Sequence, residues 1–467
     1  MATLEERLSR LAALRPAKRQ RIEEEDFQRR TPVDSDPLAH RLGAVVGKNR
    51  HGEHLLLQQW FSSPEPCDLH PEALRLLLPA KLGPEELSPL VREHLCDPSQ
   101  WLFLDTETTG LAGGTGTYAF LIGLAWWESG GLQVEQLFMR DYGEEHSLLL
   151  ELAARMASRR VLVTFNGKSF DWPLLETRYA MTRSLKPRRP EAHLDLLHPA
   201  RALWKLRLGS VRLTELERRV LDAPRLGWCR DHDIDSSFIP QFYFDYLRGG
   251  SSEPLAGVFR HNQMDLRGLA ALAGKILSLL ANAHPHAFAG DPLDIFGLSR
   301  LVQRRGQTSR ARLLYQSALD AGLPREAGCT ARRELALLAK REGDFERATA
   351  LWNELAENPQ ADPKEALRAF EQLAIYFEHR AKDPLRAAEL TRKALALLAR
   401  TKRSRWSMFE QATANKLDAR FRRRLARVER LGRLGRLAGR QPRAISPSLL
   451  DPGISAPSSP RSESNPA

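Results

Sequence analysis

The chain has 467 residues, with 70 Lys and Arg against 58 Asp and Glu, a formal net charge of +12, and 42% hydrophobic residues. This length predicts about two or three domains, each large enough to bury a core. No apolar run approaches the roughly 18 residues of a membrane-spanning helix, the first residues do not resemble a secretion signal, and the four cysteines contain no Cys-x-x-Cys pair. We therefore expect a cytoplasmic protein without a disulfide framework and without a membrane partner.

Composition divides the chain into six segments. We expect a mobile arm over 1–41, an extension over 42–98 that packs on the next domain, an α/β domain over 99–284, helical repeats over 294–400, a basic segment over 401–443 and a disordered tail over 444–467. The arm is charged and poor in apolar residues, and the tail is rich in Ser and Pro. Neither composition can bury enough apolar surface to fold alone.

The segment from 101 to 281 has the pattern of an α/β domain. Strand-like apolar runs occupy 101–104, 118–127, 132–139, 161–165 and 193–197, with helices over 147–156 and from Pro173. Glu128-Ser-Gly-Gly131 between the second and third runs is a hairpin signal. Three antiparallel strands followed by strands that alternate with helices is the order of a ribonuclease-H-like mixed sheet. Periodicity alone leaves other α/β orders open.

Residues 298–398 are helical and repetitive. Three sets of residues recur at the same offsets: Gly306, Ala311, Tyr315 and Ala318; Gly343, Ala348, Trp352 and Leu355; and, more weakly, Lys382, Ala387, Thr391 and Ala394. The periods are 37 and 39 residues, slightly longer than the roughly 34 of tetratricopeptide repeats. We expect tetratricopeptide-like helix pairs that stack through small and aromatic residues, with a non-repeating bundle as the alternative.

The positive charge is concentrated between Thr401 and Arg443, where 14 Lys and Arg stand against three acids. Such a segment suggests a polyanionic partner, most often nucleic acid. The three-residue spacing of Leu431, Leu434 and Leu437 drifts around a helix, and nearby glycines weaken that helix. We therefore expect a segment that is only partly ordered when alone and that follows a phosphate backbone. The alternatives are a solvated tail without a specific partner and a segment that docks on the repeats or binds an acidic protein.

Two acids directly follow the first strand-like run. Asp105 and Glu107 are two residues apart, so both point to one face while Thr106 turns away. Two carboxylates this close repel each other unless cations neutralise them, and hard oxygen ligands favour Mg²⁺ or Mn²⁺. The glycine-rich stretch 110–116 that follows lets a substrate backbone approach closely.

Further polar residues stand at the ends of later elements. Asp171 follows a strand and a turn, and on that segment alone a helix N-cap is the alternative interpretation. His261 and Asp265 are four residues apart, a spacing that puts both on one face of a helix. Asp195, on a probable neighbouring strand, is interpreted as structural.

Taken together, these residues resemble three motifs of the DEDD (DnaQ-like) exonuclease superfamily. The motifs are Leu104-Asp-Thr-Glu-Thr-Thr-Gly110, Phe165-Asn-Gly-Lys-Ser-Phe-Asp171 and His261-Asn-Gln-Met-Asp265. Within the superfamily the chain is similar to the YprB-like, ribonuclease-H-like family of bacterial proteins, through Gly113-Gly-Thr-Gly-Thr-Tyr118, Asn166-Gly-Lys-Ser-Phe-Asp-Trp-Pro173 and His193-Leu-Asp-Leu-Leu-His-Pro-Ala-Arg201. Members of that family often carry tetratricopeptide-like repeats downstream, as this chain does by its spacing.

The resemblance implies a 3′–5′ exonuclease in which Asp105, Glu107, Asp171 and Asp265 hold two Mg²⁺ or Mn²⁺ ions about 3.5–4 Å apart. It also implies that His261 takes the proton of the attacking water. Members with a His normally keep four residues between it and the last Asp, whereas this chain has three, the spacing of members with a Tyr. The alternative function is a catalytically weak scaffold that binds nucleic acid or protein through the repeats. DNA and RNA stay open as substrates.

Overall fold

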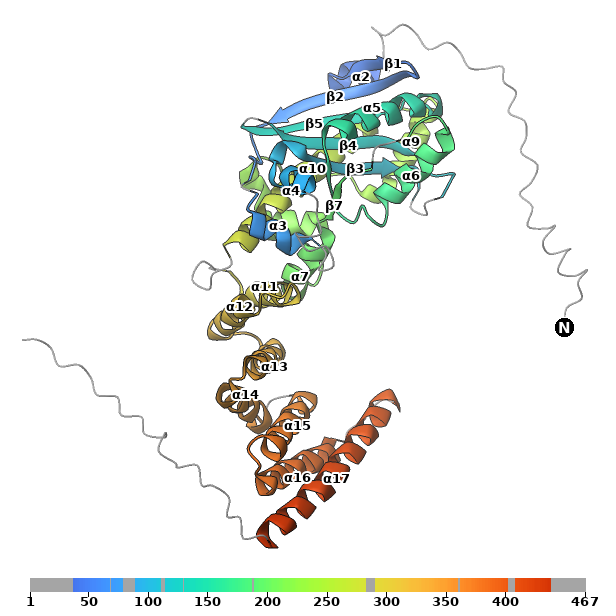
Figure 1. The fold of residues 1–467 in the computed structure, drawn as a ribbon. Coiled ribbons are helices and arrows are strands. Elements are labelled where there is room, and N and C mark those ends of the chain that lie inside the picture. Colours follow the sequence, from blue (N-terminus) through green and yellow to red (C-terminus); the bar gives the residue numbers. More distant parts are fainter. Residues whose placement is uncertain are drawn as a thin grey trace, which may run out of the picture. The chain divides into compact units, whose positions relative to one another are not determined.

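The computed structural model describes residues 37–67, 69–78, 89–110, 114–128, 130–186, 189–282, 290–359, 362–401 and 408–437. The predicted disordered tail and all but residues 37–41 of the predicted mobile arm lie outside these ranges. The chain divides into two compact units. One comprises Met1–Arg201 with Ser210–Ala281, and the other comprises Ala202–Gly209 with Asn282–Ala467. Figure 1 shows the sheet of the first unit and the helices of the second.

The first unit is built on a seven-stranded mixed sheet with the order β1-β2-β5-β4-β3-β6-β7. The strands are β1 Val45–Asn49, β2 Gly52–Phe61, β3 Trp101–Thr108, β4 Ala119–Glu128, β5 Gly131–Phe138, β6 Val161–Thr164 and β7 Ala192–Asp195. Neighbouring strands among β3, β4 and β5 pair antiparallel, and β6 and β7 continue the sheet parallel to β3. The predicted ribonuclease-H-like order is therefore confirmed.

The segment that precedes the predicted domain contributes to this sheet. β1 and β2 form an antiparallel hairpin, and β2 pairs antiparallel with β5. The predicted border between an extension and a domain at residues 98 and 99 therefore cuts across one continuous sheet. The run Leu55-Leu56-Leu57 hides the strand period in the sequence, because Leu55 and Leu57 are buried and Leu56, on the other face, is half-buried.

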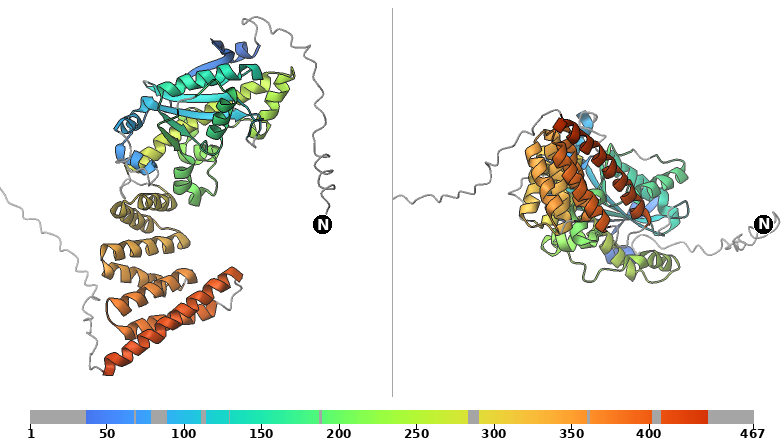
Figure 2. Two further views of the ribbon diagram at one scale, coloured as in Figure 1. Left: turned by 45° about the vertical axis from the view of Figure 1, so that its right-hand side comes forward. Right: turned by 90° about the horizontal axis from the view of Figure 1, so that it is seen from below.

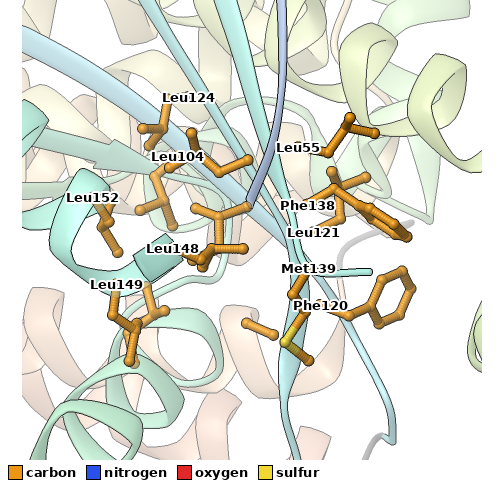
Figure 3. Packing of buried hydrophobic residues seen from close by; sticks show 14 of the residues in the cluster. Leu55, Leu104, Phe120, Leu121, Leu124, Phe138, Met139, Leu148, Leu149 and Leu152 are labelled. Atoms are coloured by element: carbon orange, nitrogen blue, oxygen red, sulfur yellow. The ribbon is translucent and has the colours of Figure 1, made fainter. Parts of the chain in front are cut away.

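Helices cover both faces of the sheet. Those of the first unit are α2 Pro37–Leu42, α3 Pro71–Leu77, α4 Pro89–Cys96, α5 Glu145–Ser158, α6 Asp171–Thr182, α8 Leu213–Leu216, α9 Ile239–Leu247 and α10 Glu253–Ala281, and α7 Leu197–Leu208 enters the second unit. Leu148, Leu149 and Leu152 of α5 pack in one cluster with Leu104 of β3 (Figure 3). Because successive residues of a strand point to opposite faces, Asp105 faces away from α5 and toward α10.

The second unit is rich in helices that follow one another closely in space (Figure 2). They are α11 Pro292–Arg304, α12 Thr308–Asp320, α13 Arg325–Glu342, α14 Phe345–Glu357, α15 Pro363–His379, α16 Pro384–Thr401 and α17 Met408–Leu437. The repeats were expected to begin at Gly306, Gly343 and Lys382, and the backbone of all three residues has a positive φ. The residues that follow at the shared offsets are all buried: Ala311, Tyr315, Ala318, Ala348, Trp352, Leu355, Ala387, Thr391 and Ala394. The tetratricopeptide class itself stays a prediction.

Much of the basic segment is helical in the full chain, whereas the expectation of partial order concerned the segment alone. Residues Met408–Leu437 form one 30-residue helix, α17, which packs on α16. Ala414, Phe421 and Val428 are buried at a seven-residue spacing, so they form one seam along the helix. Leu431 is exposed and is not part of this seam, and the side chains of Leu434 and Leu437 lie outside the described ones. Among the alternatives given for the basic segment, docking on the repeats is the one that agrees with the contact between α17 and α16.

None of the helices in the described ranges combines the length and the apolar character that crossing a bilayer requires.

Phe421→Ala should loosen α17 from α16. Phe421 is fully buried, and removing a buried Phe costs about 3–5 kcal/mol, whereas Leu431→Ala on the same helix, where the side chain is 43% exposed, should change stability by no more than about 0.5 kcal/mol. Hydrogen exchange of the α17 amides in the full chain measures both effects. Equal protection in the two variants would contradict the docked arrangement.

Candidate active site

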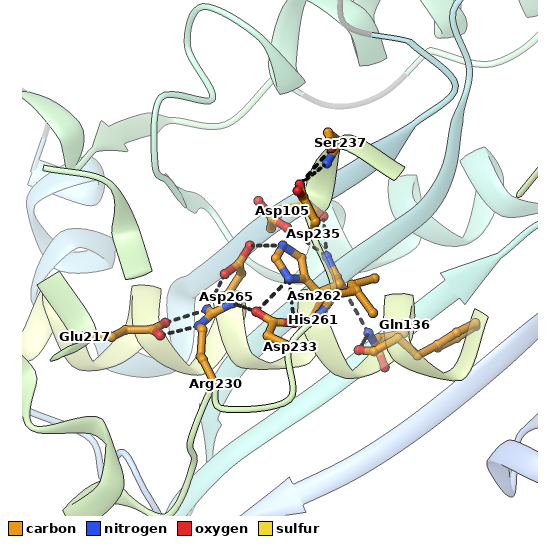
Figure 4. A network of polar contacts seen from close by, with 12 residues as sticks. Asp105, Gln136, Glu217, Arg230, Asp233, Asp235, Ser237, His261, Asn262 and Asp265 are labelled. Carbon is orange, nitrogen blue, oxygen red and sulfur yellow. Dashed lines mark hydrogen bonds and ion pairs between the residues drawn. The ribbon is translucent and has the colours of Figure 1, made fainter. Parts of the chain in front are cut away.

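Two carboxylates leave β3 on the same side. The first four residues of β3 are buried and apolar, and the last four are half-buried and polar. β3 pairs with β6 over Trp101–Phe103 and with β4 from Phe103 to Thr108, so the backbone that carries the two acids is bonded to β4. Asp105 and Glu107 are two residues apart in this strand and therefore point to the same face, as predicted. That face is covered by α10 (Figure 4).

A chain of buried amides connects Asp105 to the neighbouring elements. Asn262 of α10 is fully buried, and its Nδ2 donates to Asp105 Oδ2 at 2.9 Å. Asn262 Oδ1 accepts from Gln136 Nε2 of β5 at 2.8 Å. Gly123 of β4 leaves room for this amide, because a Cβ there would lie 2.2 Å from Asn262 Oδ1. Asp105 is thus held by side chains that the motifs did not single out for this role.

Glu107, His261 and Asp265 form the one close group of candidate metal ligands found among the described residues. One ligand atom from each lies within 4.8 Å of the other two. His261 and Asp265 share a face of α10 as predicted, with Nε2 of the imidazole 3.5 Å from Asp265 Oδ2. Asp105 and Asp171 are not members of this close group, but the charges of Asp265, Glu107 and Asp171 all act on Asp105.

Asp171 reaches the site from α6. It is the first residue of that helix, and the capping position belongs to Phe170, so the N-cap alternative for Asp171 does not apply. Thr106 Oγ1 donates to Asp171 Oδ1 at 2.6 Å. Thr106 therefore turns away from Asp105 and Glu107 as expected, but its hydroxyl binds the third acid, which the sequence did not predict.

Asp195 organises the turn that leads to Asp171. It ends β7, and its Oδ1 accepts from the backbone N–H groups of Asn166 at 2.8 Å and Leu197 at 3.1 Å, while Oδ2 accepts from that of Lys168 at 3.1 Å. Asn166 has a φ of 69°, a conformation that needs such support. These contacts give Asp195 a structural role.

Two further charged residues belong to the site and were missed. Each carboxylate oxygen of Asp233 lies 2.9 Å from His261 Nδ1. Arg230 donates from Nη1 to Asp233 Oδ2 at 2.8 Å and from Nη2 to Asp265 Oδ1. Both lie in an irregular segment, where no helical or strand period indicates which side chains converge. The only signal in the sequence is the dense run of charge Arg230-Asp-His-Asp-Ile-Asp235.

Two comparisons with known proteins bear on this arrangement. Residues 102–277 match the RNase_H superfamily. The chain is also similar to the uncharacterized protein YprB of Bacillus subtilis (strain 168). The two are 32% identical over 299 residues, which make up 63% of this chain and 68% of the relative. The chain belongs to the YprB family. The matched range spans β3 to α10 and contains every residue of the candidate site named above.

Burial and mutual repulsion determine the charge of the acids in this YprB-like site. Burial, followed by the charges of Asp265, Glu107 and Asp171, raises the pKa of Asp105 well above its usual range. Burial also raises the pKa of Glu107 to about 8, although the charge of His261 opposes the shift. The site therefore contains more negative charge than its own cations neutralise.

His261 has the opposite shift. Burial lowers its pKa, but the hydrogen bond to Asp233 and the charges of Asp265 and Glu107 outweigh burial and raise the pKa of His261 to about 9. Carboxylate oxygens that are short of positive charge are the ligands that Mg²⁺ and Mn²⁺ prefer. The donor set therefore fits divalent metal, with the tight group of Glu107, His261 and Asp265 nearest to a complete site.

Without metal, stability should fall as the pH rises from 7 to 9. Glu107 and His261 both have raised pKa values in the folded protein, so in this range these two groups bind more protons in the folded state than in the unfolded chain. Burial lowers the pKa of His54 and lowers that of His193 to about 4, and these two groups oppose the trend only below about pH 6.5. In EDTA we expect unfolding to require roughly 1–3 kcal/mol less at pH 9 than at pH 7, since one pKa unit is worth about 1.4 kcal/mol.

Glu107→Gln should flatten this pH dependence, whereas Glu176→Gln, at an exposed position on α6, should not. Urea titrations at several pH values measure the slope. A slope that is the same in wild type and Glu107→Gln would show that Glu107 is not the group that titrates.

Proposed function

We propose that the protein is a metal-dependent 3′–5′ exonuclease that hydrolyses phosphodiester bonds of nucleic acid with two Mg²⁺ or Mn²⁺ ions. The chain carries a nuclease-like domain of the RNase_H superfamily, but a fold by itself does not fix an activity. The observation that supports the proposal most is the convergence of Glu107, His261 and Asp265 next to Asp105. Acids that raise one another's pKa values in a buried site mark a functional centre.

The four acids would hold the metal. When bound, the two ions supply an activated water and stabilise the charge that develops on the phosphate and on the leaving 3′ oxygen. Asn262 keeps Asp105 directed into the site, and Thr106 does the same for Asp171. Asp265 is directed by Arg230. Three of the four proposed ligands, Asp105, Asp171 and Asp265, thus have a neighbour that limits their rotation, which is how metal sites keep their geometry.

His261 would accept the proton of the attacking water at Nε2. Its Nδ1 already contacts Asp233, so Nε2 is the nitrogen available on the side of Asp265. To act as a base the imidazole must be neutral. Glu107 and Asp265 are two of the charges that raise its pKa, and cations bound to these acids would cancel that effect. His261 would then return toward the pKa that general bases use near neutral pH.

The substrate follows from the reaction type. A nuclease-like centre implies a nucleic-acid partner, and the proposed direction places a 3′ end at the acids; DNA and RNA are both retained. The scaffold function stays the second candidate because the second unit offers stacked helices and a basic α17 for partners. The cytoplasm and a protein partner for these helices stay predictions.

Asp105→Asn should abolish hydrolysis in a folded protein. The change removes a metal ligand but keeps the side-chain shape, so stability without metal should stay equal or increase as repulsion falls. DNA and RNA oligonucleotides labelled at the 3′ or 5′ end, with Mn²⁺, Mg²⁺ or EDTA, measure the activity, and exposed Asp231→Asn serves as the control. Hydrolysis by Asp105→Asn near the wild-type rate would rule out the metal mechanism.

Divalent metal should raise the melting temperature, and Asp171→Asn should reduce or remove that increase. The acids converge only in the folded chain, so metal binds the folded state in preference to the unfolded one. Melting curves across a Mn²⁺ titration measure the shift. An unchanged shift in Asp171→Asn would exclude Asp171 from the metal ligands and leave it only its contact with Thr106.

A further inference from the structure

The segment 227–235 crosses beside α10 and brings two charged side chains to the acids of the site. Asp233 has both carboxylate oxygens 2.9 Å from Nδ1 of His261. Arg230 contacts Asp233 and Asp265 at the same time (Figure 4). One guanidinium thus ties together the two carboxylates that lie on either side of the His261 ring, one at Nδ1 and the other 3.5 Å from Nε2.

Arg230 is anchored on its other side by a buried acid. Its Nε donates to Glu217 Oε2 at 2.5 Å and its Nη2 to Glu217 Oε1 at 2.7 Å, and Glu217 is only 2% exposed. The carboxylate fits against α10 because Gly268 has no side chain, since a Cβ there would lie 2.1 Å from Glu217 Oε1. If the guanidinium moved, the buried Glu217 would lose both of these charge-assisted hydrogen bonds, which is strongly unfavourable. Arg230 therefore has one well-defined position.

A carboxylate at Nδ1 decides how the imidazole is protonated. Neutral histidine carries one proton, on either Nδ1 or Nε2, and an ionised carboxylate can only accept a hydrogen bond. Asp233 therefore keeps the proton on Nδ1 and leaves the lone pair on Nε2, the nitrogen that faces Asp265. His261 and Asp265 share a rigid helix, so neither backbone can adjust their relative placement. The direction of both side chains must come from outside α10.

We propose that Arg230 and Asp233 are positioning residues of this site: Asp233 sets the tautomer and direction of His261, and Arg230 fixes the carboxylate of Asp265. The inference rests on the proposed function, in which His261 accepts a proton and Asp265 holds metal. The planar guanidinium of Arg230 has several N–H donors in a fixed arrangement, so it can orient two carboxylates at once, whereas a single ammonium group cannot.

The tautomer of His261 can be measured without any reaction. In full-length protein labelled with ¹⁵N-histidine, in EDTA, a pH titration of the ring signals locates the range in which the imidazole is neutral, and the tautomer is read there. His261→Gln identifies its signals among the 13 histidines. We expect the Nδ1–H form in wild type and in Asp231→Asn, and a mixture or the Nε2–H form in Asp233→Asn. The Nδ1–H form persisting in Asp233→Asn would overturn the role of Asp233.

Steady-state kinetics distinguish a positioning role of Asp233 from a purely structural role. Asp233→Asn should lower kcat by roughly 10–100-fold while KM and the Mn²⁺ midpoint for stabilisation stay within about twofold, because Asp233 does not hold the ion. Adding His261→Ala to Asp233→Asn should cost no more than His261→Ala alone, since both act through one ring. Additive losses, or a change confined to KM, would contradict the proposal.

Arg230→Lys tests the guanidinium. The positive charge is kept and only the fork is lost, so the Mn²⁺ midpoint for thermal stabilisation should rise roughly tenfold. Glu217→Asp keeps all charges but shortens the anchor, and it should act in the same direction if Arg230→Lys does not fold. A midpoint within twofold of wild type in a folded variant would overturn the role of Arg230.

The two proposals fail separately. If wild type degrades none of the labelled oligonucleotides, the proposed exonuclease is wrong, and the tautomer and the Mn²⁺ midpoint still decide whether Asp233 and Arg230 position their partners. If wild type degrades them but Asp233→Asn keeps both its kcat and the Nδ1–H form, only the role of Asp233 is wrong.

Discussion

Repulsion between carboxylates at the end of β3 is the constraint that the rest of the first unit has to meet. Asp105, Glu107 and Asp265 lie close enough that each raises the pKa of another. A set of apolar side chains in the same space would be more stable, so the acids do not serve the stability of the fold. Their convergence is tolerated because Asn262 donates to one of them and Arg230 to another.

The acids can be forced together because they stand on rigid elements. β3 is paired with β4 at both acids, and α10 has 29 residues, a length of about 44 Å. Leu255 and Leu280, near the two ends of α10, are fully buried, so the helix is anchored well beyond the site. Groups placed by such elements cannot separate to relieve their repulsion. The site is therefore preformed in its backbone, and only the side-chain directions need further control.

That control comes from the parts of the chain that sequence patterns describe least well. The acids on β3 and α10 could be predicted because periods of two and 3.6 residues decide which side chains share a face. Asp233 and Arg230 lie in irregular backbone, where neither period applies and only the three-dimensional path brings them to His261. The β1–β2 hairpin was also missed, since three consecutive leucines conceal which face of β2 is buried.

Composition also describes the positive charge of α17 incompletely. Composition predicted a basic surface for a polyanion, but part of this charge is used within the second unit. Arg424 and Arg427 both bind Glu378, which is only 2% exposed, and Arg420 binds Glu371. These arginines therefore make contacts within the second unit, on the helix that also carries the apolar seam.

The net charge of +12 therefore overstates the positive surface that α17 offers to a phosphate backbone. Exposed arginines such as Arg423, Arg430 and Arg433 are still available to a nucleic acid, but their number is smaller than the composition suggests. The excess of negative charge at Asp105, Glu107 and Asp265 has no comparable internal compensation, because Arg230 is shared among three carboxylates. In the proposed function, divalent cations would neutralise this excess and bring a phosphate to the acids. The case for a nucleic-acid substrate thus depends on the acids of the first unit more than on the basic helix of the second.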